Sequence, residues 1–254
     1  AAVTLNDPRG EMMMPTVPTE RWPTPKLTFE NVLLRGKGRL LSLRNSRPFV
    51  LEVKNTLAAL DGNLLEIEPS STDPSSAGSG VVHLTNVTTC LSGTLLHIKS
   101  SEKKGEMAFS GLAKTEITAN SCLFVPSTSG QEALVRADRF DNREQVEKWF
   151  SWRGKNNLYG YDKKKVMLEI RPADLEAMPI KPIEGDRWLE FTLEEGDPFA
   201  NIRFDYVPPE AGRAKAFMAV RPGDFRVKFI EPARAEGAPE AGAGADLPKP
   251  FTEE

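Results

Sequence analysis

Apolar and polar positions repeat in a common order along three segments of the chain. The segments are FENVLLRGKGRLLSL (29–43), VKNTLAALDGNLLEI (53–67) and LTNVTTCLSGTLLHI (84–98). Each contains an asparagine, six residues, a glycine, one residue, two leucines, one residue and then leucine or isoleucine. Before each asparagine, apolar and polar residues alternate, which is the spacing of a β-strand. Each segment therefore predicts two short strands separated by a corner at which glycine permits a tight turn.

Two looser copies of the pattern follow the first three. Residues 117–137 have their asparagine and glycine ten positions apart, and residues 156–170 end on the same apolar spacing. The asparagines at 31, 55, 86 and 120 are separated by 24, 31 and 34 residues. Such periods suit successive turns of a β-solenoid whose loops differ in length.

The repeat predicts an all-β fold, a right-handed parallel β-helix of about 4–6 turns with short inserted α-helices. One turn cannot cover its own apolar face, whereas parallel stacking buries that face against the next turn. An inserted helix is expected near 141–150, where Val146, Trp149 and Phe150 have helical spacing. A second helix is expected at 186–194.

The chain divides into three predicted parts. Residues 1–25 form an extended segment or the remnant of earlier turns, and residues 26–172 form the β-helix with its inserted helix. Residues 173–254 are expected to pack on the solenoid. Their tail, 232–254, is rich in Ala, Gly and Pro, a composition that favours an extended or disordered chain.

The repeated asparagines predict a structural ladder. Side chains at the same position of successive parallel turns lie over one another, so their amides can pass hydrogen bonds along the stack. Such bonds satisfy polar groups that would otherwise cost about 1–3 kcal/mol each when buried. We expect the ladder at Asn31, Asn55 and Asn86, with Asn120 near it.

The second strand of each repeat predicts a polar stripe. Its outward position is occupied by Ser42, Glu66, His97, Arg136 and Glu169 in the five copies. Charges of opposite sign would then be neighbours. The stripe is either a ligand-binding face or a solvated solenoid face whose neighbours are compatible.

The densest aromatic stretch is WFSWRGKNNLYGY, residues 149–161. Its rings can stack on the sugar rings of a glycan, or they can shield an apolar side or end of the solenoid. Together with the polar stripe, this stretch supplies the possible ligand-facing residues: Glu66, His97, Arg136, Trp149, Trp152 and Tyr159.

The charge and hydropathy of the chain restrict the classes of partner that it is expected to bind. The chain has 33 basic and 36 acidic residues, a net charge of -3, and no basic run of the kind that binds nucleic acid. It contains no apolar run of the roughly 18–20 residues that span a bilayer, and its first eight residues lack the pattern of a signal peptide. We therefore expect no nucleic-acid partner and no membrane insertion within this chain, and localisation stays open.

The sequence offers little catalytic chemistry. It has two histidines and two cysteines, in no zinc-binding spacing, and the cysteines Cys90 and Cys122 are expected to be free and buried. Nucleophile-elbow, phosphate-loop and zinc-protease motifs are absent, and the acidic residues of the repeats are scattered among bases. No catalytic, cofactor-binding or metal-binding residue is predicted.

As a set, several motifs resemble the C-terminal β-helix regions of large planctomycete-type bacterial proteins. The motifs are LLRGKGRLLSLR, TLAALDGNLLEIE, VTTCLSGTLLHI, FSWRGKNNLYGY, DRWLEF and GAGADLPKPF. In many of those proteins the β-helix, which is pectate-lyase-like, follows a serine/threonine protein kinase domain. The resemblance implies a right-handed parallel β-helix that serves as a sensory or interaction module. This chain carries no kinase motif.

Three functions fit these observations. The first is a non-catalytic module that binds a protein or a glycan, or acts as a scaffold, as an accessory part of a larger multidomain bacterial protein. The second is a polysaccharide-active lyase or glycoside hydrolase, which requires carboxylates and bases to converge in a groove. The third is a purely architectural subunit of a surface or multi-chain assembly, because the ends of a solenoid can stack on other chains.

Overall fold

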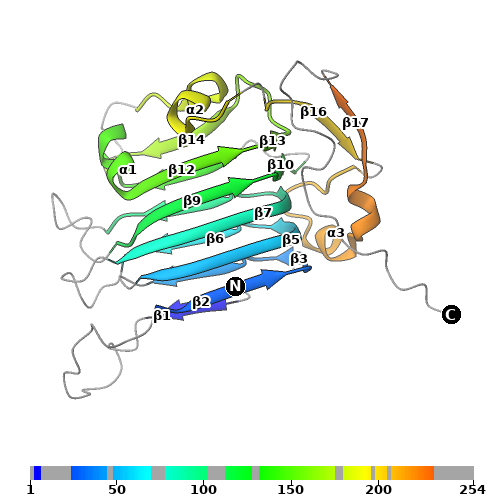
Figure 1. The fold of residues 1–254 in the computed structure, drawn as a ribbon, viewed down its shortest axis with the longest axis horizontal. Helices are drawn as coiled ribbons and strands as arrows, with labels where there is room; N and C mark the ends of the chain where they lie inside the picture. The colour runs from blue at the N-terminus through cyan, green and yellow to red at the C-terminus, as the bar shows by residue number, and fades with distance from the viewer. Residues whose placement is uncertain are drawn as a thin grey trace.

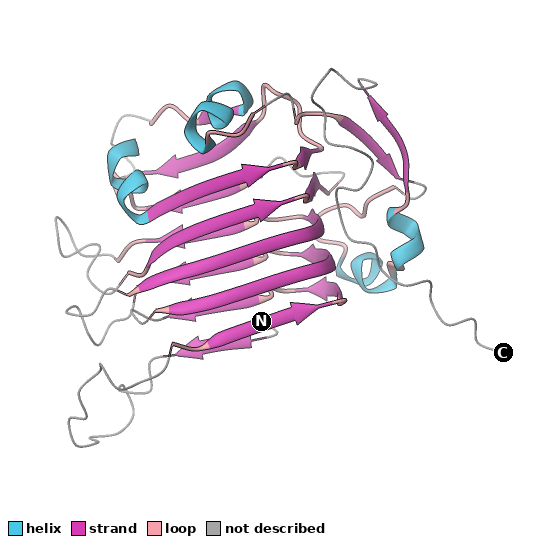
Figure 2. Ribbon diagram, viewed as in Figure 1, coloured by secondary structure: helices cyan, strands magenta, loops and turns pink. Residues whose placement is uncertain are grey.

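A computed structural model gives the arrangement of the chain. It describes residues 3–6, 24–44, 48–69, 78–101, 112–127, 132–174, 180–195, 198–204 and 207–231. Within these ranges the protein is mostly β-structure, arranged in two large sheets of largely parallel strands (Figures 1 and 2). The expectation of a β-rich fold with parallel strands is thereby confirmed. Most of the predicted segment 1–25 and the whole of the tail 232–254 lie outside the described residues.

The first sheet, called sheet A, has seven strands and forms one of the two layers. It is parallel from its first strand to β14 and ends with one antiparallel strand, β15. In spatial order its strands are β1 (Val3–Asn6), β4 (Leu41–Arg44), β6 (Leu65–Glu68), β8 (Leu96–Lys99), β11 (Val135–Asp138), β14 (Val166–Arg171) and β15 (Ile183–Glu184).

The second sheet, called sheet B, has eight strands and forms the other layer. Two of its strands are long and bend at a corner, so each pairs with separate shorter strands along its two halves. The strands are β2 (Lys26–Glu30), β3 (Leu33–Lys37), β5 (Phe49–Asp61), β7 (Ser79–Leu91), β9 (Lys114–Asn120), β10 (Leu123–Pro126), β12 (Phe150–Lys155) and β13 (Leu158–Tyr159).

In every repeat the chain passes from sheet B to sheet A and then returns to sheet B. Successive parallel strands of sheet A are therefore neighbours in space although strands of sheet B separate them in the sequence (Figure 1). The register places like positions of the repeats beside each other, as in Leu41 with Leu65 and Leu65 with Leu96. These inward leucines are at most 1 % exposed and belong to one continuous core between the sheets. The apolar spacing of the sequence thus translates directly into a shared core.

The corner asparagines adopt left-handed backbone conformations. Asn31, Asn55 and Asn86 have φ angles of 57°, 42° and 52°. Asparagine tolerates this region better than most residues. Asn55 Nδ2 donates a hydrogen bond of 2.6 Å to Asn31 Oδ1 across the two repeats. The asparagine repeat therefore marks a backbone requirement as well as an amide contact.

The fourth repeat differs from the predicted ladder by one position. Asn120 is the last residue of β9 and lies opposite Thr85, inside the strand. The left-handed corner falls on Ser121, whose φ is 53°, and in the fifth repeat on Asn156, whose φ is 56°. The physical reason is that the corner is fixed by the strand register, which leaves the asparagine one residue short of it.

The glycines of the repeat allow the backbones of successive corners to approach closely. Gly38 and Gly62 have φ angles of 128° and 154°. A Cβ atom added to Gly62 would lie 2.2 Å from the carbonyl oxygen of Gly38, and one added to Gly93 would lie 2.3 Å from Asn63 Oδ1. Only a residue without a side chain fits at these positions.

Two helices cover the end of the sheets that carries the last repeat (Figure 1). Helix α1 (Arg143–Trp149) is capped by Asn142, whose side chain accepts from the backbone N–H of Gln145. Helix α2 (Gly185–Thr192) contacts β12, β14 and β15. Both helices coincide with segments that the sequence predicts as helical.

A further group of elements covers the outer side of sheet B along the strand segments that follow the asparagine corners. It comprises β16 (Asn201–Phe204), α3 (Ala214–Ala219), the short 3-10 helix η4 (Pro222–Phe225) and β17 (Val227–Glu231). The sequence did not predict α3, which is only six residues long. Side chains from this group bury the outward residues of β3, β5, β7, β10 and β13 in a second core cluster. Its members include Leu57, Ala59, Cys90, Leu123, Phe204 and Phe217.

No helix among the described residues is both long enough and apolar enough to cross a bilayer.

Candidate functional site

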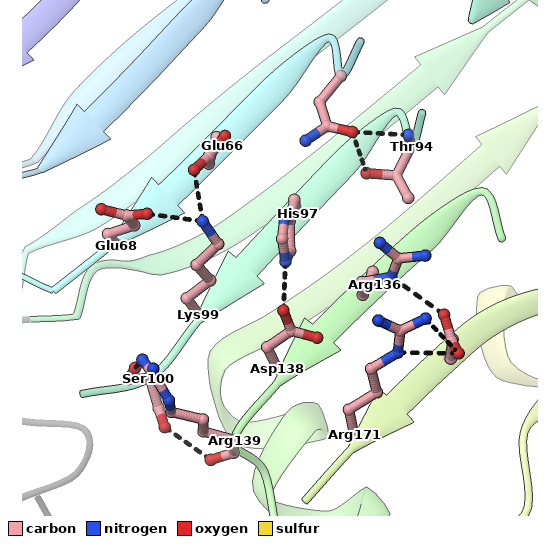
Figure 3. Close-up of polar contacts among 12 residues, drawn as sticks. Glu66, Glu68, Thr94, His97, Lys99, Ser100, Arg136, Asp138, Arg139 and Arg171 are labelled. Carbon is pink, nitrogen blue, oxygen red and sulfur yellow. Dashed lines mark hydrogen bonds and ion pairs between the residues drawn. The ribbon is translucent and has the colours of Figure 1, made fainter. Parts of the chain in front are cut away.

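The outer face of sheet A carries the polar stripe that the sequence predicts. Strand pairing places Ser42 beside Glu66, Glu66 beside His97, His97 beside Arg136 and Arg136 beside Glu169. Figure 3 shows Glu66, His97 and Arg136 projecting from neighbouring parallel strands. The predicted neighbours are therefore brought together in the predicted order.

A second polar row runs beside the first, two residues further along each strand. It was not predicted, although the same alternation of the sequence contains it. Its charges alternate in sign from strand to strand: Arg44, Glu68, Lys99, Asp138 and Arg171. We call the two rows together the ionic face.

Glu66 is the most enclosed charge of the ionic face. Its side chain is 5 % exposed, forms an ion pair with Arg39 and accepts from Lys99 Nζ at 2.6 Å. Lys99 Nζ also donates to Glu68 at 2.8 Å, and Glu68 pairs with Arg44 at 3.0 Å. Burial would raise the pKa of Glu66, but Lys99 and Arg39 outweigh it and hold that pKa well below its usual range.

His97 and Asp138 form a diagonal pair across β8 and β11. His97 Nε2 lies 2.7 Å from Asp138 Oδ2 (Figure 3). Burial would raise the pKa of Asp138, but the hydrogen bond from His97 and the nearby charges of Arg136 and Arg171 lower it. Asp138 is therefore a carboxylate at neutral pH and serves as the acceptor for His97.

At the end of the ionic face formed by β11 and β14, arginine and glutamate side chains form a connected series of ion pairs. Arg136 Nε donates to Glu169 at 3.0 Å, and Arg136 also pairs with Glu132. Arg171 Nε donates to the other oxygen of Glu169 at 2.9 Å. The carboxylates of the face are thus matched with cations of the same face or its rim, which leaves a flat, nearly neutral ionic surface.

The aromatic candidates lie away from the ionic face, in the core or beside it. Trp152 and Tyr159 are 3 % and 0 % exposed and belong to the core, where both contact Phe124. Trp149 is half-buried at the end of α1 and packs against the same core. The expectation of sugar-stacking rings is wrong for Trp152 and Tyr159, because these side chains fill the space between the sheets at the last repeat.

A buried polar cluster was missed by the sequence reasoning. Glu194 is 6 % exposed and accepts from the Tyr159 hydroxyl at 2.7 Å and from Asn157 Nδ2 at 2.8 Å. Burial raises the pKa of this carboxyl group. Nothing in the local sequence marks Glu194, which is followed by a second glutamate and has no repeat partner.

The thiols are inert by position. Cys90 and Cys122 are free and buried, as expected, and burial raises the pKa of each to about 12. They face different core clusters. Among the described residues, no group of three or more His, Cys, Asp or Glu side chains is placed to hold a metal ion.

Comparisons with known proteins give no match. No protein-family model, no curated protein and no solved structure is significantly similar to this chain.

Proposed function

We propose that the chain is a non-catalytic binding module built on a short right-handed parallel β-helix, and that its ionic face docks a protein partner. The module would act as a sensory or accessory part of a larger multidomain protein. The proposal of a β-helix is supported by the crossing between two parallel sheets in every repeat and by the matched registers.

One observation carries the non-catalytic assignment. A general acid on a glycosidic bond needs an accessible carboxyl group with a raised pKa. On the ionic face the pKa values of Glu66 and Asp138 are lowered, so both are ionised at neutral pH. The pKa of Glu194 is raised, but its carboxyl group is enclosed in the core. The two properties that the general acid of a glycoside hydrolase needs therefore occur at different places.

The shape and charge of the ionic face favour a macromolecular partner. Ten polar positions lie on five adjacent strands, and in the second row charges of alternating sign are held in fixed places by ion pairs. Such a preordered pattern can select a partner surface of complementary pattern, because a mismatched register juxtaposes like charges.

Site-specific photo-crosslinking tests this function. A photoreactive amino acid replaces Arg44 or Arg171, which are 62 % and 51 % exposed at the two ends of the face, and the variants are irradiated in cells of the source organism. Arg153, exposed on the outer side of sheet B, is the matched control position. We expect one discrete protein adduct from positions 44 and 171 and none from position 153.

The alternatives give different outcomes in the same experiment. Adducts of glycan only, together with cleavage of a polysaccharide that Glu66→Gln abolishes, would establish the enzyme. Adducts between copies of this chain would establish the architectural subunit. Equal labelling from all three positions would mean that the ionic face has no special role, and the proposal would be abandoned.

A further inference from the structure

The carboxyl group of Glu194 connects the end of α2 to the last repeats. Besides binding Glu194, Asn157 Nδ2 donates to the carbonyl oxygen of Ala119 at 2.9 Å. Asn157 Oδ1 accepts from the backbone N–H of Cys122 at 2.9 Å. The Tyr159 hydroxyl fixes the second carboxyl oxygen. Glu194 is therefore the point at which α2 is attached to β13 and to the corner between β9 and β10.

The surrounding structure makes room for this carboxyl group at the expense of apolar burial. A Cβ atom on Gly154 would lie 2.2 Å from Glu194 Oε2, so the absence of a side chain at position 154 leaves space for the carboxyl group. The preceding residue, Leu193, has a left-handed φ of 54° and is 86 % exposed. A bulky residue seldom adopts this conformation. The backbone thus exposes the leucine side chain to solvent and buries the glutamate side chain, whereas leucine is usually buried and glutamate exposed.

Helix α2 lies directly over the last repeat. Its Trp188 is fully buried and packs edge-on against Trp152 of β12, with ring centroids 5.4 Å apart. Thr192, at the end of the helix, is also buried. Any loosening of the segment from Trp188 to Glu194 therefore uncovers the aromatic end of the core.

Glu194 is the group in this cluster whose raised pKa makes its charge depend on burial. Among the described residues, no lysine, arginine or histidine forms an ion pair with Glu194. The titratable groups that face it are Tyr159 from β13 and Cys122 beside β10. Burial raises the pKa of Tyr159 well above its usual value and that of Cys122 to about 12, so both stay neutral. From β12 the neighbour is Gly154, which does not titrate.

We propose that Glu194 is a proton-controlled latch, which holds α2 on the last repeat while its carboxyl group is protonated and releases the helix when that group ionises. In the closed state the protonated carboxyl accepts from Asn157 Nδ2 at Oε1, and its own O–H can donate to the Tyr159 oxygen, 2.7 Å from Oε2, without a buried charge. Among the described residues no cation offsets the lost hydration of an ionised carboxylate at this position, so moving Glu194 into water becomes favourable.

The direction of the pH effect follows from linkage. Burial raises the pKa of Glu194 in the closed state, so that state binds the proton more tightly than the open one. The attachment of α2 is complete below the ordinary glutamate pKa of about 4.3 and weakens as pH rises through the raised value. Within that window, the opening equilibrium of α2 should increase about tenfold for each pH unit.

Hydrogen exchange of the α2 backbone amides in the full chain, corrected for the intrinsic pH dependence of exchange, measures this opening. We expect protection of residues 185–194 to fall as pH rises in the wild type and to stay constant in Glu194→Gln. The amide of glutamine replaces the protonated acid and cannot ionise. The exposed neighbour provides the control, Glu195→Gln, which should behave as the wild type.

A second variant separates the latch from a general loss of packing. The hydrogen bond from Tyr159 lowers the pKa of Glu194, so its removal in Tyr159→Phe should shift the opening transition to higher pH. The proposal is overturned if α2 protection in the wild type does not depend on pH, if Glu194→Gln retains the wild-type dependence, or if Tyr159→Phe moves the transition to lower pH.

Discussion

At the scale of single residues, the corners impose the strictest requirements. Gly62 combines a φ of 154° with a carbonyl oxygen at the place where its Cβ would be. That oxygen belongs to Gly38 of the preceding repeat, and a backbone atom cannot move aside as a flexible side chain can. The close approach of successive backbones, rather than the turn alone, explains why glycine recurs at this point.

We predict that Gly62→Ala destabilises the protein by about 1–3 kcal/mol, because the added methyl forces the two corners apart and strains the backbone. Urea denaturation followed by circular dichroism measures the change. Gly223→Ala is the control, since a Cβ there meets no atom within 4 Å, and it should leave the unfolding midpoint nearly unchanged. Equal midpoints for the two variants would contradict the close packing of the corners.

Residue roles were only partly predictable from the sequence. Asn31, Asn55 and Asn86 repeat at fixed positions relative to glycine, so their corner role was visible. Ser121 was not, because the strand register rather than the residue type decides where the fourth corner falls. Glu194 was invisible, since its burial depends on contacts with Asn157, which is far from it in sequence.

At the scale of the elements, the strands that carry the ionic face are linked to their neighbours by charged side chains. Lys99 of β8 binds both Glu66 and Glu68 of β6, and Glu66 is nearly enclosed. A buried carboxylate that loses a cation suffers a desolvation penalty without compensation. The ion pairs between β6 and β8 therefore differ from ordinary surface pairs.

We predict that Lys99→Met lowers the free energy of unfolding at pH 7 by about 1–3 kcal/mol, with Arg39 left as the remaining cation beside Glu66. Lys114→Met is the control, because Lys114 and Glu116 are about half exposed and such a pair contributes at most about 1 kcal/mol. Chemical denaturation at matched ionic strength measures both. Similar losses in the two variants would contradict the special role of Lys99.

The same pair has a defined pH dependence. The pKa of Glu66 is lowered in the folded protein, so its stabilising contribution is complete above the ordinary glutamate pKa of about 4.3. That contribution is lost as pH falls through the lowered value. The difference in stability between wild type and Lys99→Met should therefore be largest near neutral pH and shrink in acid.

Element positions were more predictable than element contacts. The repeated alternation indicated the strands that lie within the repeats, although not β1 or β15. The spacing of Val146, Trp149 and Phe150 indicated the helix that is observed at Arg143–Trp149. Helix α3 was missed because it is short and begins without a side-chain cap. Its anchor, Phe217, is recognisable only once the outward apolar residues of sheet B are known.

At the scale of the whole molecule, the stacking of successive repeats organises the structure. Equivalent strands of successive repeats lie side by side in both sheets, so the core is continuous and the ionic face spans five strands. Helices α1 and α2 cover one end, while among the described residues β2 and β3 pair only with β5. The proposed β-helix, its binding face and its latch all depend on this stacking.

Pulsed electron paramagnetic resonance between paired spin labels tests the stacking most directly. Labels at positions 44 and 171 lie on β4 and β14, and labels at positions 28 and 153 lie on β2 and β12; each pair is separated by four strand spacings. The native thiols are buried, and burial raises their pKa to about 12, so the label should react with the introduced cysteines. The account predicts a distance of about 19 Å for both pairs. A clearly different distance in either sheet would contradict the parallel stacking of the repeats.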